Sequence, residues 1–524
     1  ISASGVLDLS GLNYTNAEAL TINGTGITSG GALINSSTTA ATYAGLLTLG
    51  SDSSIVGGSG SITLSNVGTI TGAFGLTLGG ATGGTVTSII GTSSLTKAGA
   101  GTWTLNGVNT YTGNTTVSTG TLVVGGSGSL ASGSYTGTLS VSSGATFQFS
   151  SSANQAFGSG STGAIGSGAG TILFNGSGVI TINGNNGFNG TLNAAQSVAI
   201  QGGTTGLSSA TTIEIMNGGL ITVKATDNNG FMYTTGTPNL IIDTGGKLTS
   251  GVSQNNTYHL NNITLAGGEL AWANPSCLST SNCATWGTWM IDGTITVTQD
   301  STISAQGITF NKSGGNIFNV SAGKTLTVTG SFFKSSSAVD TGFTKSGSGT
   351  MYLNPTGSYN TYEGATTISA GTLKLGNANA LGSTAGGTSI ASGAVLDLNG
   401  VNYSNAEALT INGAGIASGG AVMNSSATGA TYAGLLTLGS TGGSIVGESG
   451  TIALSNVGTI TGATYGLTLG GAAGGSITSI IGTTTGTLTK ADAGTWTLNG
   501  VNTYTGNTTI SAGALVIGSS GSLN

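Results

Sequence analysis

The amino-acid sequence predicts an all-β chain folded as one continuous parallel β-helix, or β-solenoid, over residues 1–524. Three observations support this prediction. Short segments such as Thr102–Leu105 and Thr294–Val297 alternate apolar with polar residues and are rich in Thr, Val and Ile, as half-buried strands are. Glycine and asparagine turns separate these segments, and no stretch offers a capped amphipathic helix. Long blocks of sequence recur, which favours stacked coils over a sandwich or a barrel.

The composition suits a stack of uncharged coils. Charged residues make up 5% of the chain, whereas an ordinary soluble domain has about 25%. Because like residues lie above like residues in a solenoid, charges would repel one another along each row, and Thr, Ser and Asn do not. At 37% hydrophobic residues the chain can bury a core, which a disordered chain cannot do. The 98 glycines supply the turns.

The charge balance excludes several partners. The net charge is −6, and all nine basic residues are lysines spread along the chain. Nucleic acids require clustered Lys or Arg, so we expect no nucleic-acid partner. No apolar run approaches the roughly 20 residues of a transmembrane helix, so we expect no transmembrane segment here. The chain begins at Ile1 without a signal peptide, which we interpret as a mature fragment or an excerpt and not as evidence for the cytoplasm.

The two ends of the chain form a large internal repeat, residues 1–135 and 390–524. The matching blocks keep their length, as paired strands must, and inserted residues fall in the Gly/Ser/Thr segments between them, where loops tolerate them. The matching blocks are Asn16–Gly24 with Asn405–Gly413, Thr42–Ser51 with Thr431–Ser440, Leu64–Ala73 with Leu454–Ala463, and Gly101–Thr116 with Gly494–Thr509.

A shorter motif recurs near residues 97–122, 345–373 and 490–515. Its shared positions in the first copy are Lys97, Gly101, Trp103, Leu105, Asn109, Tyr111, Gly113, Thr115 and Leu122. The middle copy has Met351 in place of the tryptophan, and either Tyr359 or Tyr362 takes the tyrosine position. We expect Trp103, Trp496 and Met351 to fill the core.

This pattern of Lys, Gly, Trp, Leu, Asn, Tyr, Gly and Thr resembles the autotransporter-associated β-strand repeat, also called the passenger-associated transport repeat. The resemblance covers only the motif segments, a minor part of the chain. It implies a right-handed parallel β-helix that serves as the exported passenger of a bacterial surface protein. It also implies a leader and a C-terminal membrane barrel, which would lie outside this excerpt.

One region departs from the solenoid pattern. Cys277 and Cys283 are spaced for a small disulfide-closed loop in an oxidising compartment, which predicts an insertion near residues 274–286. Two unpaired thiols are the alternative. A two-cysteine metal site is not expected, because structural zinc requires four ligands and the single histidine, His259, is far away in the sequence.

Three of the five tryptophans, Trp272, Trp286 and Trp289, lie around this loop. Aromatic rings beside a projecting loop could present a platform for sugar rings, which makes these residues the candidate glycan-binding site. The sequence favours the other interpretation, in which the rings fill a wider part of the core.

Nothing in the sequence marks a catalytic centre. His259 has no Ser, Asp or Cys partner at a recognisable spacing. The 15 acidic residues are scattered, and the nearest approach to a calcium cluster, Asp227–Gly230 with Asp243–Gly246, is explained better by turns. We therefore expect no catalytic residue, no metal, no cofactor and no enzyme activity.

The sequence as a whole predicts an extracellular structural or adhesive surface rod, the passenger segment of a long repetitive autotransporter-like protein at the bacterial cell surface. Two alternatives remain: a self-assembling filament or cell-surface layer component, and a glycan-binding or glycan-cleaving passenger. The expected partners are further copies of the chain or neighbouring surface components, with a glycan as a further candidate.

Overall fold

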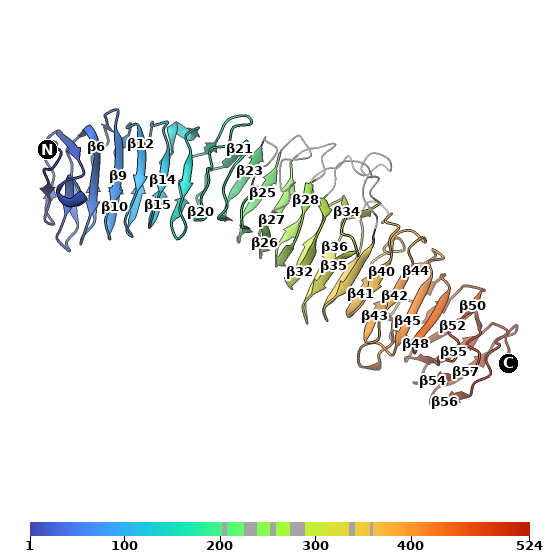
Figure 1. Ribbon diagram of the computed structural model, residues 1–524. Helices are drawn as coiled ribbons and strands as arrows, with labels where there is room; N and C mark the ends of the chain where they lie inside the picture. Colours follow the sequence, from blue (N-terminus) through green and yellow to red (C-terminus); the bar gives the residue numbers. More distant parts are fainter. Residues whose placement is uncertain are drawn as a thin grey trace. The chain divides into compact units, whose positions relative to one another are not determined.

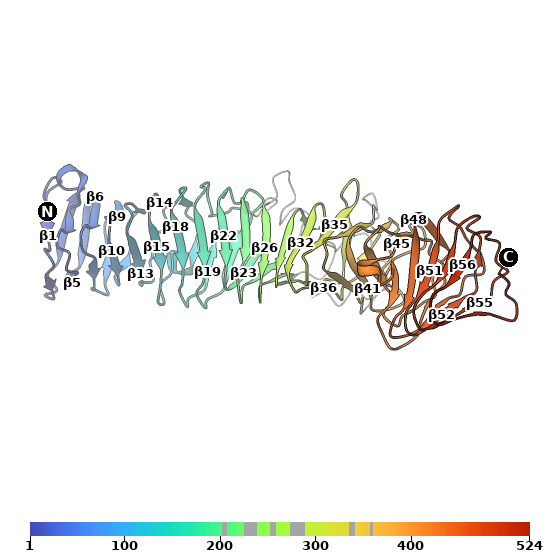
Figure 2. The ribbon, with the colours of Figure 1, turned by 90° about the horizontal axis from the view of Figure 1, so that it is seen from below.

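The computed structural model describes residues 1–201, 207–224, 238–251, 258–272, 289–334, 341–356 and 360–523. The chain divides into two compact units, Ile1–Val252 and Ser253–Asn524. Each unit is a parallel β-solenoid, in which the strands of consecutive coils lie side by side (Figure 1, Figure 2). The predicted all-β class and the parallel solenoid are therefore confirmed. The Cys277–Cys283 loop, Trp286, Tyr359 and Asp227 lie outside the described residues.

The strands of the first unit form sheets in which each strand pairs with those of the neighbouring coils. One sheet contains β1 (Leu7–Asp8), β3 (Leu20–Gly24), β4 (Leu33–Asn35), β6 (Leu47–Gly57), β9 (Gly75–Gly79), β12 (Ser94–Lys97), β14 (Thr115–Val117) and β17 (Leu139–Val141). The next contains β2 (Asn13–Tyr14), β5 (Ala41–Tyr43), β7 (Ile62–Leu64), β10 (Gly83–Val86), β13 (Thr102–Leu105), β15 (Thr121–Val124), β18 (Thr146–Phe149), β20 (Thr171–Phe174), β22 (Thr191–Ala194), β24 (Thr212–Ile215) and β26 (Asn239–Asp243). The remaining strands are β8 (Thr69–Ile70), β11 (Ile89–Ile90), β16 (Ser134–Tyr135), β19 (Gln155–Phe157), β21 (Ile180–Asn183), β23 (Ser197–Gln201), β25 (Leu220–Val223) and β27 (Lys247–Ser250).

The second unit is built in the same way. One sheet contains β29 (Ile263–Ala266), β32 (Thr294–Gln299), β35 (Asn316–Val320), β38 (Phe343–Ser346), β40 (Thr366–Ile368), β42 (Thr388–Ile390), β45 (Leu409–Gly413), β48 (Leu436–Gly447), β51 (Leu467–Gly470), β54 (Leu488–Lys490) and β56 (Thr508–Ile510). Another path contains β30 (Glu269–Leu270), β33 (Ser301–Ile303), β36 (Thr325–Val328), β39 (Thr350–Leu353), β41 (Gly371–Leu375), β43 (Ala394–Asp397) and β46 (Val422–Asn424). The others are β44 (Asn402–Tyr403), β47 (Ala430–Tyr432), β49 (Ile452–Leu454), β52 (Gly474–Ile477), β55 (Thr495–Leu498), β57 (Ala514–Ile517), β50 (Thr459–Ile460), β53 (Ile480–Ile481), β28 (Tyr258–Leu260), β31 (Trp289–Ile291), β34 (Ile308–Phe310) and β37 (Phe332–Phe333).

The core lies inside the coils and follows from the alternation of side chains along each strand. In β13 the side chains of Trp103 and Leu105 are buried, whereas Thr102 and Thr104 face outward. Strand β15 repeats this arrangement in the same register, with Trp103 opposite Leu122 and Leu105 opposite Val124. Rows of apolar side chains therefore run from coil to coil, and the outward rows are mostly hydroxyls and amides.

Both copies of the large repeat form the same strands. In the first copy β5, β7, β10 and β13 follow one another, and in the second copy β47, β49, β52 and β55 do so. Within the described residues the helical segments are single 3₁₀ turns, η1 (Ile27–Ser29), η2 (Ala131–Gly133) and η4 (Ile416–Ser418), of which η1 and η4 occupy equivalent places in the two copies. None of the described helical segments has the length and apolar character needed to cross a membrane.

Candidate functional site

The short motif is anchored by a buried lysine. The Lys97 ammonium donates hydrogen bonds to the carbonyl oxygens of Ala98 (3.0 Å), Gly99 (2.6 Å) and Thr119 (2.9 Å). Ala98 and Gly99 belong to the turn that follows β12, and Thr119 belongs to the turn of the next coil. All three ammonium protons therefore have an acceptor, and the lysine links the turns of consecutive coils.

The other two copies repeat this arrangement. Lys345 donates to the carbonyls of Ser346, Gly347 and Ala370, and Lys490 donates to those of Ala491, Asp492 and Ala512. All three lysines are buried. Burial lowers the pKa of Lys97 and of Lys345 to about 8 and also lowers the pKa of Lys490. At neutral pH the amines of Lys97 and Lys345 are still mostly protonated and can use all three donors.

The motif tryptophan packs against a glycine of the preceding coil. Trp103 lies directly opposite Gly84, and its indole nitrogen donates to the carbonyl of Gly79 at 2.8 Å. A Cβ atom at Gly84 would lie 2.9 Å from the indole ring and 2.1 Å from the carbonyl oxygen of Ile62. The large ring therefore occupies space that the glycine leaves free.

The last copy has the same pair, because Trp496 lies opposite Gly475 and donates to the carbonyl of Gly470 at 2.9 Å. In the middle copy Met351 lies opposite Leu326 instead. Trp103, Trp496 and Met351 are all fully buried, as predicted. The smaller methionine is thus matched by a larger residue beneath it.

Two further motif positions satisfy buried polar groups. The Asn109 amide accepts from the backbone N–H of Ile90 at 2.9 Å and donates to the carbonyls of Gly107 and Ser129, so it bridges three coils. The Tyr111 hydroxyl bonds to the hydroxyl of Thr115 at 2.9 Å.

In the middle copy Tyr362 bonds to Thr366 at 2.6 Å in the same way. Tyr362 therefore occupies the motif position for which the sequence also offered Tyr359. The amide of Asn360 accepts from the N–H of Phe332 and donates to the carbonyl of Ala380, so it takes the place of Asn109.

The aromatic residues of the departing region that the structure describes lie in the interior of the second unit. Trp272 and Trp289 are buried, and their ring centroids are 5.4 Å apart. Tyr258 packs against both rings, at 5.8 Å from Trp272 and 5.2 Å from Trp289. The indole nitrogen of Trp289 donates to the carbonyl of Ala271 at 2.9 Å. Since Trp286, Cys277 and Cys283 lie outside the described residues, the glycan platform and the disulfide stay predictions.

His259 has an acidic neighbour that the sequence did not reveal. Its Nδ1 lies 2.5 Å from Oδ2 of Asp292, and the amide of Asn311 donates to Oδ1 of Asp292 at 2.6 Å. The coils bring these residues together because β28, β31 and β34 are adjacent strands, and Asp292 and Asn311 directly follow the last two. No spacing rule could have found this pair, since it depends on the length of an irregular coil.

A pair of acidic side chains lies on the outside of the first unit. Burial raises the pKa of Glu214 in β24, and the nearby carboxylate of Asp243 in β26 raises it further. Within the described residues no three His, Cys, Asp or Glu side chains come close enough together to hold a metal ion.

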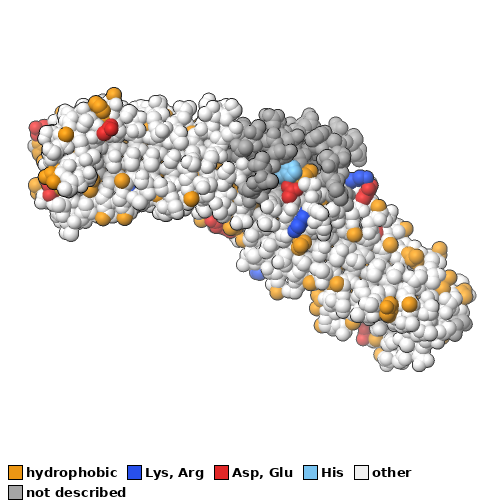
Figure 3. Space-filling view, in the orientation of Figure 1, with side chains coloured by type: hydrophobic (Ala, Val, Ile, Leu, Met, Phe, Trp, Pro, Cys, Tyr) orange, Lys and Arg blue, Asp and Glu red, His pale blue; other side chains and the backbone are white. Residues whose placement is uncertain are grey.

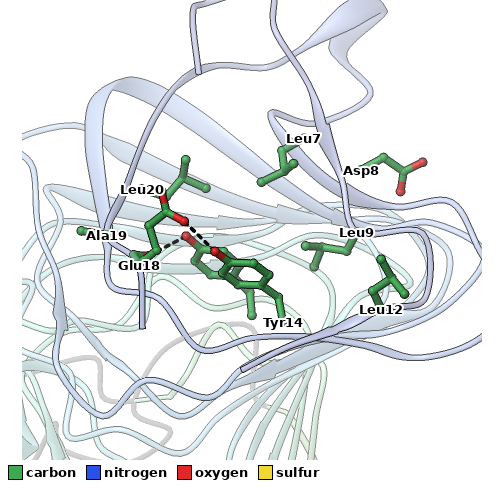
Figure 4. A pocket seen from close by; sticks show the side chains of 9 residues that line it. Leu7, Asp8, Leu9, Leu12, Tyr14, Glu18, Ala19 and Leu20 are labelled. Carbon is green, nitrogen blue, oxygen red and sulfur yellow. Dashed lines mark hydrogen bonds between the residues drawn. The ribbon is translucent and has the colours of Figure 1, made fainter. Parts of the chain in front are cut away.

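A cavity of about 300 Å³ opens on the first coil (Figure 4). The Tyr14 hydroxyl donates to the carboxylate of Glu18 at 2.5 Å, and the Tyr43 hydroxyl donates to the backbone carbonyl of Glu18 at 2.8 Å. The two tyrosine rings stack with centroids 5.6 Å apart. The residues that line the cavity are Leu7, Asp8, Leu9, Leu12, Tyr14, Glu18, Ala19, Leu20 and Tyr43.

The second copy shows the same cluster inside the core. Tyr403 and Tyr432 stack with centroids 5.4 Å apart and bond to Glu407 as their counterparts bond to Glu18. Here a preceding coil covers the cluster, and the Thr388 hydroxyl of β42 donates to the Glu407 carboxylate at 2.6 Å. Burial raises the pKa of Glu407. The cavity on the first coil is therefore lined by residues that pack coil against coil in the second copy, so it is no argument for a ligand.

Charges are sparse on the surface of each unit. In the space-filling view most of the visible described surface is white, which marks backbone and side chains that are neither charged nor hydrophobic (Figure 3). Among the described residues the ion pair of Lys334 with Glu363, at 2.6 Å, is exposed, and that of Lys374 with Asp397, at 3.6 Å, is half-buried. Over the part of the surface that the structure describes, the hydroxyls and amides form neither a phosphate-binding patch nor a strongly charged groove.

Comparison with known proteins finds a family of sequence repeats that matches the short motif described above. Three segments match the passenger-associated-transport-repeat, residues 95–124, 343–375 and 488–517. Each segment contains one of the buried lysines and the tryptophan or methionine opposite the preceding coil. The chain is thus a parallel β-solenoid that carries three passenger-associated transport repeats, and the resemblance inferred from the sequence is confirmed.

A curated relative is the adhesin BmaC autotransporter of Brucella suis biovar 1 (strain 1330). It is 33% identical over 155 residues, which cover 28% of this chain and 4% of the relative. The similarity therefore spans only a small part of that protein's length. No solved structure shows a detectable similarity to the chain.

Proposed function

We propose that this chain is part of the exported passenger of an autotransporter and acts at the bacterial cell surface as a structural or adhesive element. The observation that carries the proposal is the set of three passenger-associated transport repeats, each built into a parallel solenoid. The printed name of the relative, an adhesin autotransporter, supports the adhesive side of the proposal.

The physical chemistry of the fold agrees with a structural role. A parallel solenoid adds length by adding coils, and the two copies of the large repeat add coils without adding a new cluster of reactive groups. Lysine is a reactive group in many enzymes. In this chain Lys97, Lys345 and Lys490 each donate hydrogen bonds to carbonyls in a buried turn. The repeated polar residues therefore serve the fold, and we propose no enzymatic activity.

Glycan cleavage is an alternative function that can be tested directly. Polysaccharide hydrolysis requires two carboxyl groups that flank a sugar, with one proton donor. The pair Glu214 and Asp243 shares an outward face of the first unit, which makes it the first target for such a test. A panel of plant and bacterial polysaccharides incubated with the chain should release no reducing ends, and turnover that Glu214→Gln abolishes would contradict the structural proposal.

The adhesive proposal is tested by display on cells. A laboratory bacterium that expresses residues 1–524 for export should be labelled by antibody without permeabilisation. It should also attach to other cells or to a solid support better than the parent strain. A matched strain that displays only an epitope tag is the control. If the cells are labelled but attach no better than the control, the adhesive function is rejected and the structural role is kept. Failure of surface labelling would contradict the passenger assignment.

A further inference from the structure

We propose that an apolar surface, repeated in both copies of the large repeat, binds the same surface of a second copy of this chain. This inference rests on the proposed surface function and specifies its partner. In the first copy the surface consists of Leu46, Thr69, Ile89 and Val108 on consecutive coils, with Val67 beside them; we call it the first apolar corner. Val67 is 77% exposed and Val108 is 45% exposed.

The backbone register places these residues in one row. Thr69 and Ile89 are direct partners in the pairing of β8 with β11. A Cβ atom at Gly68 would lie 3.0 Å from the Leu46 side chain, so Leu46 covers the turn that carries Val67. The backbone N–H of Thr110 donates to the carbonyl of Ile90, which places Val108 beside Ile89 on the next coil. Leu46, Thr69, Ile89 and Val108 therefore lie on neighbouring coils.

The most exposed side chain of the first apolar corner is held in place. The Asn66 amide donates to the carbonyl of Ala44 at 2.9 Å and accepts from the N–H of Gly68 at 2.7 Å. These bonds fix the Asn66–Gly68 turn and direct Val67 away from the core. Such an apolar group loses little conformational freedom when a partner covers it.

The second copy repeats the surface residue by residue. Leu435, Thr459, Ile480 and Val501 form the row and Val457 lies beside it, and we call this the second apolar corner. Val457 is 76% exposed and Val501 is 59% exposed.

The turn of the second corner is fixed by the same two bonds. The Asn456 amide donates to the carbonyl of Ala433 at 2.9 Å and accepts from the N–H of Gly458 at 2.7 Å. Every residue type of the first corner is thus kept in the second. By contrast, the outward Thr63 and Thr85 of the first copy correspond to Ala453 and Ser476.

The middle of the chain lacks such a surface in its described part. Between the two copies the only strongly exposed large apolar side chain among the described residues is Val179. Scattered single apolar side chains are normal on protein surfaces, whereas adjacent exposed apolar side chains mark interaction sites. The exposed apolar residues therefore belong to the repeat itself.

The absence of charge at the corner argues against a charged partner and is compatible with another copy of the chain. Between residues 40 and 115 the charged residues are Asp52, which lies in β6, and Lys97, which is buried. The second copy carries Glu448, Asp492 and the buried Lys490 over the corresponding stretch, none of them in the corner. A charged partner would find no counter-charge there, whereas two identical neutral corners meet without repulsion and satisfy the self-matching that a two-fold interface requires.

Sedimentation velocity of the whole chain tests the proposal. We expect reversible association that strengthens in ammonium sulfate and changes little between 50 and 500 mM NaCl, because apolar contacts respond in this way. The double variant Val67→Thr/Val457→Thr keeps the side-chain shape and adds a hydroxyl, and we expect it to raise the dissociation constant by about tenfold or more. Val179→Thr is the matched control and should leave the dissociation constant unchanged.

A cross-link identifies the contact. With Cys277 and Cys283 replaced by Ser, mild oxidation of Val67→Cys should give a disulfide-linked dimer, and Val179→Cys should not. The proposal is wrong if the parent chain stays monomeric at all concentrations, if the double variant associates as tightly as the parent, or if the chain binds neutral phosphatidylcholine vesicles through Val67 while remaining monomeric. Cell attachment without self-association would retain the adhesive function and reject this inference alone.

Discussion

The outer and middle copies of the short motif solve one packing problem in two ways. In the outer copies a tryptophan lies on a glycine, Trp103 on Gly84 and Trp496 on Gly475. In the middle copy Met351 lies on Leu326. A leucine follows on the other side in all three, for example Leu122 above Trp103.

This difference teaches which motif positions are free to change. Where the core side chain is larger, the residue opposite it in the preceding coil is smaller, and the reverse holds in the middle copy. The two volumes compensate because a close-packed interior tolerates neither a void nor an overlap. Lys97, Asn109 and Tyr111 keep their types because each bonds to buried backbone or hydroxyl groups that no apolar side chain could satisfy.

The largest loss is expected from Trp103→Ala. Gly84 offers no side chain that could fill the space, so the change should leave a cavity and an unpaired Gly79 carbonyl and cost about 3–5 kcal/mol. Hydrogen exchange followed by mass spectrometry, on peptides that cover residues 95–124, measures this as a lower free energy of local opening. Protection equal to that of the parent chain would show that the ring does not support the coil.

The next largest loss is expected from Lys97→Met, which keeps the length of the side chain but removes its donors. The carbonyls of Ala98, Gly99 and Thr119 lose their shared partner, at a cost of about 3 kcal/mol. The exposed Lys334→Met is the matched control and should cost less than about 1 kcal/mol. Hydrogen exchange of the peptides that contain each substituted residue compares the two variants, and equal effects would contradict the linking role of the buried lysine.

A smaller loss is expected from Gly84→Ala. The added Cβ would overlap the Ile62 carbonyl and the Trp103 ring, and relief by shifting the coil should cost about 1–3 kcal/mol. Gly187→Ala is the control, because the nearest atom to its added Cβ is 3.7 Å away. Trp103→Met should relieve the overlap with the ring but not the overlap with the Ile62 carbonyl, so a partial rescue of Gly84→Ala would demonstrate the exchange of volume between the two positions.

Stability should also rise with pH above neutrality. In the folded chain the pKa of Lys97 and of Lys345 is about 8, below the ordinary 10.5, so the unfolded chain binds more protons between these values. Each lysine should therefore add about 1 kcal/mol between pH 8 and pH 9. Urea unfolding at both pH values measures the gain, which should shrink in Lys97→Met; a midpoint that falls over this interval would contradict the shift.

The smallest effect is expected from Met351→Leu. The two side chains have similar volumes, and Leu326 and Leu373 already surround the site with branched residues, so the cost should stay below about 1.5 kcal/mol. Exchange of peptides that cover residues 343–375 provides the measurement. A loss as large as that of Trp103→Ala would mean that the middle copy is packed as tightly around its own residue as the outer copies are.

Much of the fold could be read from the sequence, because alternation and repetition are local signals. The pattern Thr102–Leu105 places Trp103 inside and Thr104 outside without any knowledge of the neighbouring coil. The register between coils was not readable, since coils differ in length. The pairing of Trp103 with Gly84, and of His259 with Asp292, therefore required coordinates.

The motif lysine was found as a repeated position but its role was missed. Lysines are rarely buried, and Lys97 has no acidic partner that would have suggested burial. The available signal was that three of the nine lysines precede a glycine turn at the same place in the motif. The exposure of Val67 was equally hidden, although the Asn66–Gly68 turn that carries it is a recognisable turn sequence.

Pairing restricted to neighbouring coils has a consequence for how the chain can assemble. A finished coil already presents the complete row of N–H and C=O groups on which the following coil forms. A polypeptide that passes through a narrow opening can therefore fold one coil at a time, starting from whichever end emerges first. The folding of each coil does not require a segment that is remote in the sequence. The folding of each added coil is favourable in free energy. A coil that has folded beyond the opening would have to unfold before the polypeptide could move back through it.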